Sequence, residues 1–330
     1  MIDRAARWLN DFLPGRPTTV HISPTNRCTL RCRQCDLWNL PTDGELDVPR
    51  WKQVVSDLRD DLGEFALKIS GGEPFCVPDL LELVEHAKGL GLYVGLSSNG
   101  TRIDRETAQR IADAGVEEIH LSLDSLDPAI HDDLRGVKGT HRRVLQALDN
   151  LAAAGGKTQR CLATVVTRLN LEVLPELVRW ATDREDLYTI TLQALFQNFG
   201  APYDPDWWRV SDLWPGDGEA VTRVFDELIE YKQTHWELAN PAEQLVAMHD
   251  YFLDPTRTPV ATCQAGKTDI AVDPRGNLRL CFNMPPVGNL LESRPRALLH
   301  SLAAAKRRRQ IAACQRSCNL LNCNYGDRED

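Results

Sequence analysis

The chain has 330 residues, of which 42% are hydrophobic and 26% are charged, a balance typical of a soluble globular enzyme. Its formal net charge of −9 disfavours a general nucleic-acid-binding protein, because phosphate contacts require a basic surface. No run approaches the ~20 apolar residues of a membrane span, and the N-terminal stretch lacks the apolar core and cleavage site of a signal peptide. We therefore expect a cytoplasmic protein that binds neither nucleic acid nor a membrane.

The first two thirds of the chain alternate between strand-like and helical runs. Residues 1–17 precede this alternation, and residues 2–13 predict a short amphipathic capping helix. The strand-like runs are residues 19–23, 65–70, 92–97, 118–123, 160–166 and 187–195, and the helical runs lie near 49–62, 78–90, 104–114, 140–154 and 172–183. Strands that alternate with helices predict a parallel sheet with right-handed crossovers. Because a closed barrel needs eight such units, these six predict an open α/β fold, a partial (β/α)6 TIM-like barrel over residues 18–196.

A group of three cysteines directly follows the first expected strand. Cys28, Cys32 and Cys35 lie within eight residues. Thiolates on one short loop can converge on a soft metal centre, and clustered thiols in a reducing compartment indicate metal rather than disulfides. An iron–sulfur cubane takes four thiolates, so three would leave one iron with an open position. A zinc loop is the alternative for this group of thiols.

A Cys-x3-Cys-x2-Cys loop after the first strand of a βα repeat resembles the radical S-adenosylmethionine (SAM) superfamily. The resemblance implies a [4Fe–4S] cluster on Cys28, Cys32 and Cys35, with SAM bound to the open iron. An electron from the cluster would cleave SAM to a 5′-deoxyadenosyl radical, which removes a hydrogen atom from substrate. Gln34 departs from the family, which often has an aromatic residue at this position, and this changes the packing over the cluster rather than its ligation.

The ends of the following strands carry further candidate cofactor contacts. Ligands of parallel α/β sheets bind beyond the carboxyl ends of the strands, and paired glycines let the backbone approach a ligand closely. By the resemblance, the turn after the second strand binds the amino group of SAM, and later strand ends bind its other parts. The residues carried over are Gly71, Gly72, Glu73, Pro74, Asn99, Ser122, Asp124 and Arg135, the last of them in an expected turn at residues 134–136. Each alone also fits ordinary turn chemistry, so their repeated placement carries the prediction.

Residues 197–256 are expected to form a substrate or linker segment. The aromatic residues at its start suit either a substrate wall or a hydrophobic anchor; they are Phe196, Phe199, Tyr203, Trp207, Trp208 and Trp214. A helix over 219–236 and a connection over 237–256 follow.

A second group of thiols lies in residues 257–330, a small α+β domain. A hairpin around the turn at 273–277 brings Cys263 towards Cys281, and a helix over 295–313 returns the chain to Cys314, Cys318 and Cys323. This pattern resembles the SPASM or twitch extension and implies one auxiliary [4Fe–4S] cluster, with one of the last three cysteines spare. A structural zinc site is the alternative. Residues 306–309 form a basic run on that helix, either a solvated face or a docking site for a flavodoxin or ferredoxin electron donor.

The function implied is that of a radical SAM oxidoreductase-type enzyme that activates a C–H bond. We expect a small polar metabolite of the sugar or aminocyclitol type as substrate. The alternatives are a peptide that is epimerised or crosslinked and, in another class, a zinc-stabilised binding protein without catalysis. Cys76 is a candidate hydrogen donor and Cys161 a core residue. The candidate bases are Asp204, Asp206, His120 and Arg135.

Overall fold

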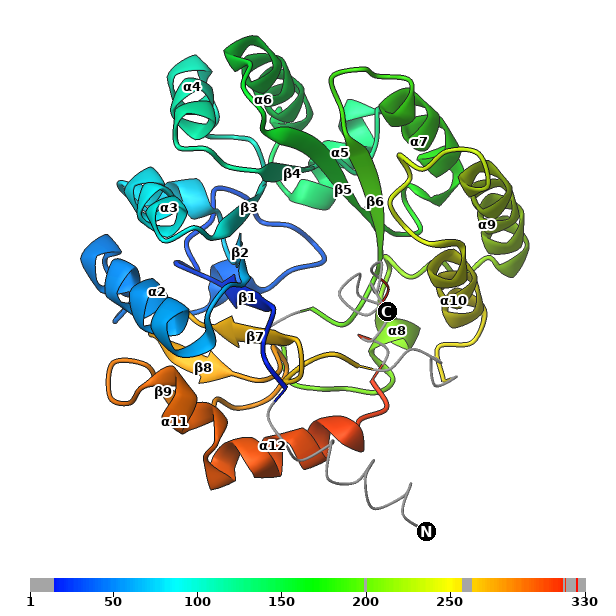
Figure 1. Ribbon diagram of the computed structural model, residues 1–330. Helices are drawn as coiled ribbons and strands as arrows, with labels where there is room; N and C mark the ends of the chain where they lie inside the picture. Colours follow the sequence, from blue (N-terminus) through cyan, green and yellow to red (C-terminus); the bar gives the residue numbers. More distant parts are fainter. Residues whose placement is uncertain (1–14, 199–200, 257–262, 317, 319–324, 326–330) are drawn as a thin grey trace.

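The computed structural model describes residues 15–198, 201–256, 263–316, 318 and 325 (Figure 1). The expected capping helix at residues 2–13 lies outside these ranges. Among the described helices, none combines the length and apolar character needed to cross a membrane.

Six parallel strands form the centre of the molecule, as the sequence predicted. They are β1 (Thr19–Ile22), β2 (Ala66–Ile69), β3 (Tyr93–Ser98), β4 (Glu118–Ser122), β5 (Gln159–Val166) and β6 (Thr189–Ala194). Each strand pairs in parallel with the next along the chain, so their order is that of an open, partial barrel. Helices connect successive strands and lie around the outside of the arc (Figure 1). These helices are α2 (Val48–Leu62), α3 (Leu80–Gly89), α4 (Arg105–Asp113), α6 (Thr140–Ala154) and α7 (Leu174–Thr182).

The strand faces divide into an apolar outside and a polar inside. Val20 and Ile22 of β1 are fully buried, as are Ile119 of β4 and Trp51 of α2. The alternate side chains of each strand point to the other face and are half-buried and mostly polar. The helices therefore bury one face of the sheet, and the other face surrounds the interior of the barrel.

One helix of the barrel was not predicted. The sequence placed a turn at residues 134–136, but α5 (Pro128–Arg135) ends there instead. Asp127 accepts a hydrogen bond from the N–H of Ala129 at its start, and Gly136 adopts φ 70° at its end. Proline in the first turn and a left-handed glycine at the end are the normal boundaries of a helix. Short 3-10 helices are η1 (Leu37–Asn39), η2 (Pro74–Cys76) and η3 (Leu171–Val173).

The segment after β6 is more helical than predicted. It contains α8 (Trp207–Val210), α9 (Gly218–Lys232) and α10 (Ala242–Leu253). The expected connection at 237–256 was wrong, because α10 forms within it. Leu245, Met248 and Phe252 of α10 are buried.

The C-terminal hairpin continues the barrel sheet. β7 (Asp269–Val272) pairs in parallel with β1, and β8 (Asn277–Arg279) and β9 (Gly288–Asn289) extend it with antiparallel pairing. The predicted hairpin is thus present. The single helix predicted at 295–313 was wrong: α11 (Pro295–Leu299) and α12 (Leu302–Ala312) are separate, because Ser301 caps α12 by accepting a hydrogen bond from Ala304 N–H.

Candidate functional site

Cys28, Cys32 and Cys35 lie on the loop between β1 and η1 and are half-buried. The loop is held against the end of α5, where Arg33 N–H donates to Leu134 O at 3.0 Å. A Cβ on Gly136 would lie 2.1 Å from Arg31 O, so this contact requires glycine. Burial and, to a smaller extent, the neighbouring Cys32 and Cys35 raise the pKa of the Cys28 thiol to about 11. The three thiols are therefore close together and would ionise on binding a metal.

Two observations bear on the group that these thiols would hold. Across the described ranges, no three His, Cys, Asp or Glu side chains surround a point that one metal ion could occupy. A cubane places a different requirement on its thiolates, because each iron takes its own ligand. Gln34 Oε1, beside Cys35, is buried without a hydrogen-bond partner. An orphaned buried oxygen next to three thiols fits a site that encloses a further group.

Glu73 of the Gly-Gly-Glu-Pro turn is fully buried and connects three segments. Its Oε1 accepts from Ser98 Oγ at 2.8 Å and from Phe75 N–H at 3.3 Å, and its Oε2 accepts from Asn99 N–H at 2.8 Å. Asn99 in turn donates to Thr29 Oγ1 at 3.1 Å and to the sulfur of Cys28 at 3.7 Å. Glu73 thus positions Asn99 against the thiol loop.

Gly71 and Gly72 pack against the chain that leads into the thiol loop. Gly71 has φ +105°, and a Cβ on Gly72 would lie 2.3 Å from Arg27 O. Pro74 is buried at the start of η2. Ser122 is half-buried at the inner face of β4. The structure therefore brings these predicted residues to one end of the barrel, next to the cysteines.

Asp124 and Arg135 form a buried ion pair on the other side of the loop. Arg135 Nη2 donates to Asp124 Oδ1 at 2.8 Å, and its Nε lies 2.6 Å from Oδ2. Arg135 also lies near the Cys32 thiol, where its charge opposes the burial that raises the pKa of this thiol. The guanidinium is therefore a link between β4, α5 and the first cysteine group.

The second group of thiols also converges. Burial raises the pKa of the Cys318 thiol to about 12, and Cys281, Cys314 and Cys263 lie close enough to contribute to this shift. Four thiols from three segments can supply a cubane. Cys323 lies outside the described residues, so the question of the spare cysteine stays open.

A cavity lies between the two groups of cysteines. Its lining includes side chains that follow β6, the aromatic segment, α10 and the C-terminal segment; they are Phe196, Gln197, Asn198, Ala201, Tyr203, Pro205, Trp207, Trp208, Tyr251, Pro255, Asn283, Gln315, Arg316 and Cys318. Asn198 donates to Arg33 O at 3.3 Å and to Asp36 Oδ2 at 3.1 Å, which ties this wall to the first thiol loop. Cys318 belongs to the second group, so the cavity lies against that group and shares Asn198 with the first thiol loop.

The aromatic residues of this segment were predicted to form either a hydrophobic anchor or a substrate wall. Some of them are buried and others line the cavity. Trp214 is buried and packs edge-on against Trp207 and Tyr251. Tyr203 and Trp208 line the cavity. Phe199 lies outside the described residues.

The inner face of the barrel carries a cluster of charged side chains. The sequence analysis named only one of its members, His120. The register places Lys68, Gly95 and Glu118 side by side on β2, β3 and β4. The Lys68 ammonium bonds the Glu118 carboxylate across Gly95, and His120 Nε2 lies 3.4 Å from the same carboxylate oxygen. A polar residue at every second position of a strand was the available signal. Among the named bases, Asp204 and Asp206 are exposed on the aromatic segment and Arg135 is paired, so His120 is the one on the inner face of the barrel.

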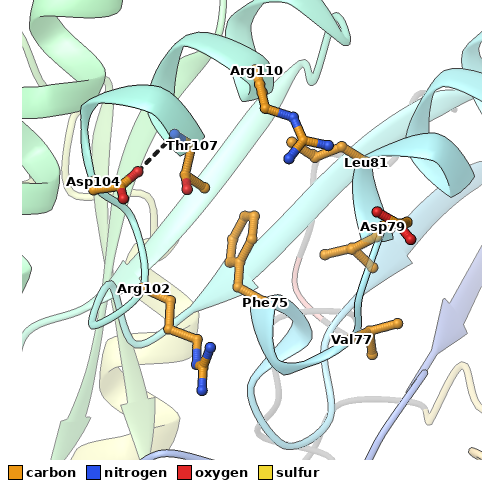
Figure 2. A pocket seen from close by; sticks show the side chains of 9 residues that line it. Phe75, Val77, Asp79, Leu81, Arg102, Asp104, Thr107 and Arg110 are labelled. Atoms are coloured by element: carbon orange, nitrogen blue, oxygen red, sulfur yellow. Dashed lines mark hydrogen bonds between the residues drawn. The ribbon is translucent and has the colours of Figure 1, made fainter.

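Cys76 lies at the end of η2, half-buried, with its pKa raised by burial, and Arg102 approaches it. The adjacent Phe75 and Val77 point instead into a second cavity between the starts of α3 and α4 (Figure 2). Asp104, at the start of α4, accepts a hydrogen bond from Thr107 N–H there. Cys161 is buried, in line with its predicted core role.

The basic run on α12 is not a uniform solvated face. Lys306 and Arg309 are exposed, but Arg308 is 5% exposed and donates to the carbonyls of Gly266 and Leu299. Arg308 therefore ties α12 to the loop before β7, and the expectation of a fully solvated run was wrong for this residue.

A partial barrel with three thiols and glycine-rich strand-end loops at one end defines a class of enzyme that cleaves SAM on an iron–sulfur cluster. Residues 22–181 match the model of the Radical SAM superfamily, and this part of the chain belongs to that superfamily. Its members use a [4Fe–4S] cluster and SAM as cofactors.

Several known proteins are similar to parts of the chain. A PqqA peptide cyclase of Bradyrhizobium diazoefficiens is 32% identical over 171 residues, which are 51% of this chain and 44% of that protein. An AdoMet-dependent heme synthase of Oleidesulfovibrio alaskensis is 34% identical over 47% of this chain and 40% of that protein. The mycofactocin maturase MftC of Mycobacterium ulcerans is 29% identical over 78% of this chain and 66% of that protein. The chain thus spans less than half the length of the first two relatives.

Among solved structures, Streptococcus suis SuiB bound to its precursor peptide SuiA aligns with a TM-score of 0.69 and 18% identity, over 98% of this chain and 78% of that chain. At this identity the likeness shows the fold alone. It confirms the partial barrel predicted from the sequence.

Proposed function

We propose that the chain is a radical SAM enzyme that modifies a peptide. The observation that carries the proposal is the cavity between the two groups of cysteines, which Asn198 ties to one group and which Cys318 of the other group lines. Relatives named as a peptide cyclase and as a mycofactocin maturase support a peptide over the sugar or aminocyclitol that the sequence suggested. Residues from four separate segments of the chain line this cavity, which suits an extended substrate.

The residues of the chain have distinct parts in this proposal. Cys28, Cys32 and Cys35 would hold the SAM-binding cluster, whose chemistry when loaded is to supply a hydrogen-abstracting radical from SAM. Asn99, held by Glu73, and Arg135, held by Asp124, would fix the loop and the bound SAM. Cys263, Cys281, Cys314 and Cys318 would hold the auxiliary [4Fe–4S] cluster at the far end of the cavity.

Two further assignments of this proposal concern protons and electrons. His120 would accept a proton from the substrate, because Glu118 orients its ring on the inner face of the barrel. Lys306 and Arg309 would face an acidic flavodoxin or ferredoxin as electron donor. Cys76 stays a candidate hydrogen donor beside the Gly-Gly-Glu-Pro turn.

The first test uses anaerobically purified protein with SAM and dithionite. We expect about eight irons per chain, matching two cubanes, and release of 5′-deoxyadenosine. Cys32→Ala should abolish this release. Cys281→Ala should lose about half of the iron and keep some release. Release that persists in Cys32→Ala would refute the assignment of that loop, and zinc without iron would favour a scaffold protein.

The second test identifies the substrate class. The enzyme is incubated in D2O with a synthetic peptide library or with a panel of sugars and aminocyclitols, and products are analysed by mass spectrometry. We expect altered peptides, with a lost pair of hydrogens or gained deuterium, and increased 5′-deoxyadenosine release. Turnover of the sugar panel with no change in any peptide would overturn the peptide proposal.

A further inference from the structure

One arginine in the cavity wall has no acidic partner. Arg316 lies between Cys314 and Cys318 in the chain, and its guanidinium carbon lies 3.8 Å from the centre of the Tyr203 ring. Both residues line the cavity between the two groups of cysteines. Within the described part of the chain, Arg316 makes no ion pair, although its side chain is only partly exposed.

A second stacked arginine nearby shows the contrast. Arg209 lies 4.5 Å from the centre of the Trp208 ring, so it has a similar aromatic neighbour. Its Nε, however, lies 2.9 Å from Asp206 Oδ1, and both side chains are mostly exposed. Arg209 has its carboxylate within the protein, whereas Arg316 has none among the residues that the structure describes.

Stacking prepares a guanidinium for recognition of a carboxylate. The ring of Tyr203 holds the planar group by one face and leaves its N–H edge available. That edge matches the two oxygens of a carboxylate, which an arginine binds with paired hydrogen bonds. Because the side chain is already oriented, binding costs less conformational entropy than it would for a freely moving arginine.

The other polar groups of the wall suit a peptide backbone. Asn283 and Gln315 line the same cavity, and their side-chain amides make no hydrogen bond within the described residues. Each amide can both donate to and accept from a peptide group. Phe196 and Trp208 supply apolar surface beside them. The wall therefore offers amide, aromatic and cationic groups together.

We propose that Arg316 binds a carboxylate of the peptide substrate, from an Asp or Glu side chain or from the peptide's C-terminus. This inference rests on the proposed peptide-modifying function and names the chemical feature that the peptide carries. Arg316 acts as a specificity-determining residue at the end of the cavity that Cys318 lines, so the carboxylate lies on the side of the second group of cysteines.

The test is a binding measurement that needs no turnover. The fluorescence of the iron-loaded enzyme, which has Trp207 and Trp208 at the cavity, is titrated with acetylated, amidated pentapeptide libraries whose central residue is Glu or Gln. We expect the Glu library to bind about tenfold more tightly or better, the usual effect of a hydrogen-bonded charge. A Gln library with a free C-terminus separates a terminal from a side-chain carboxylate, and either preference supports the proposal.

The variants assign the effect to Arg316. Arg316→Gln should remove the preference, while the matched Arg209→Gln should keep it. Tyr203→Leu, which lies outside the cysteine-bearing segment, should reduce the preference about threefold or more without changing the iron content, since the ring orients the guanidinium. This variant keeps the test valid if Arg316→Gln disturbs the second cluster.

The results that contradict the proposal are equally distinct. Equal binding of all three libraries to the unaltered enzyme, or an unchanged preference in Arg316→Gln, would overturn it. N-acetylglutamate amide that binds as tightly as the Glu peptides would assign the site to a small acid instead of a peptide. Release of 5′-deoxyadenosine without peptide should be the same in Arg209→Gln as in the unaltered enzyme. Its absence in the unaltered enzyme would contradict the proposed function rather than this site.

Discussion

Arg135 and Asp124 are joined by two close N–O contacts in the interior, with Nη2 2.8 Å from Oδ1 and Nε 2.6 Å from Oδ2. Arg135 is 8% exposed and Asp124 is fully buried. The pair connects the end of β4 to the end of α5, and the same guanidinium reaches the Cys32 thiol. The position of the first thiol loop therefore depends on a charge pair that water does not reach.

Removing one partner of this pair should be costly. Asp124→Asn leaves the guanidinium of Arg135 buried without its countercharge, and we expect a loss of about 3–5 kcal/mol in the free energy of unfolding. Urea denaturation measures the change, and the iron content of the same samples reports on the loop. Asp133→Asn is the control, since Asp133 pairs with Arg33 at the surface and should cost less than about 1 kcal/mol. Equal stability of the two variants would contradict a structural role for the pair.

Glu73 should act on SAM binding by holding Asn99 in place. Glu73→Gln places an amide NH2 opposite either Asn99 N–H or Phe75 N–H, so we expect a loss of about 1–3 kcal/mol in the free energy of unfolding. Because Asn99 then shifts from the thiol loop, SAM should bind more weakly. Calorimetric titration of SAM into the iron-loaded enzyme measures this effect. Glu82→Gln, at an exposed surface pair with Lys52, is the control and should change neither quantity measurably.

Gly95 should be required for the charged cluster inside the barrel. A Cβ at this position would lie 2.7 Å from Glu118 Oε1 and 3.0 Å from Lys68 Cδ. Gly95→Ala should push these side chains apart and destabilise the protein by about 1 kcal/mol. Gly89→Ala, at the end of α3 with no atom within 4 Å of the new Cβ, should be neutral or slightly stabilising. Urea denaturation compares the free energies of unfolding of the two variants. A Gly95→Ala protein as stable as the Gly89→Ala protein would show that the charged cluster can accommodate the added methyl group.

His131 should make stability depend on pH. Burial lowers its pKa from 6.5 to about 4, against the attraction of Asp124, and Asp124 N–H donates to its Nδ1 at 3.1 Å. Between these values the unfolded chain binds a proton that the folded chain does not. The stabilisation is therefore complete above pH 6.5 and decreases as the pH falls to about 4, by about 3 kcal/mol.

His131→Asn keeps a hydrogen-bond acceptor but has no proton to bind in this range. Its free energy of unfolding should fall less steeply from pH 7 to pH 4 than that of the unaltered protein. The measurement is urea denaturation at a series of pH values. His300→Asn, at an exposed position, should leave the profile unchanged. Parallel profiles for His131→Asn and the unaltered protein would mean that His131 does not contribute in this range.

The strand predictions were accurate because each strand buries one face against helices. Val20 and Ile22 alternate with half-exposed residues, and β2 and β4 show the same alternation. The predictions failed where a short sequence pattern is compatible with two different local structures. The Leu-Arg-Gly segment fits both a turn and the last turn of α5, and the contact of Gly136 with Arg31 O selects the helix. Within 295–313, Ser301 interrupts a run of good helix formers because its hydroxyl caps the second helix.

By itself, the sequence determined the partial barrel, the two groups of cysteines and the strand-end loops, because these depend on periodicity and on spacing along one short segment. Only the tertiary structure decided which distant groups meet. It showed Glu73 beneath Asn99, Asn198 against the first thiol loop, and Lys68 beside Glu118 across Gly95. It also showed that Arg316 has a ring beside it and, across the described ranges, no carboxylate partner. Contacts of this kind join residues far apart in the chain. Their geometry follows from the packing of strands and helices, and this packing cannot be predicted from a local sequence pattern.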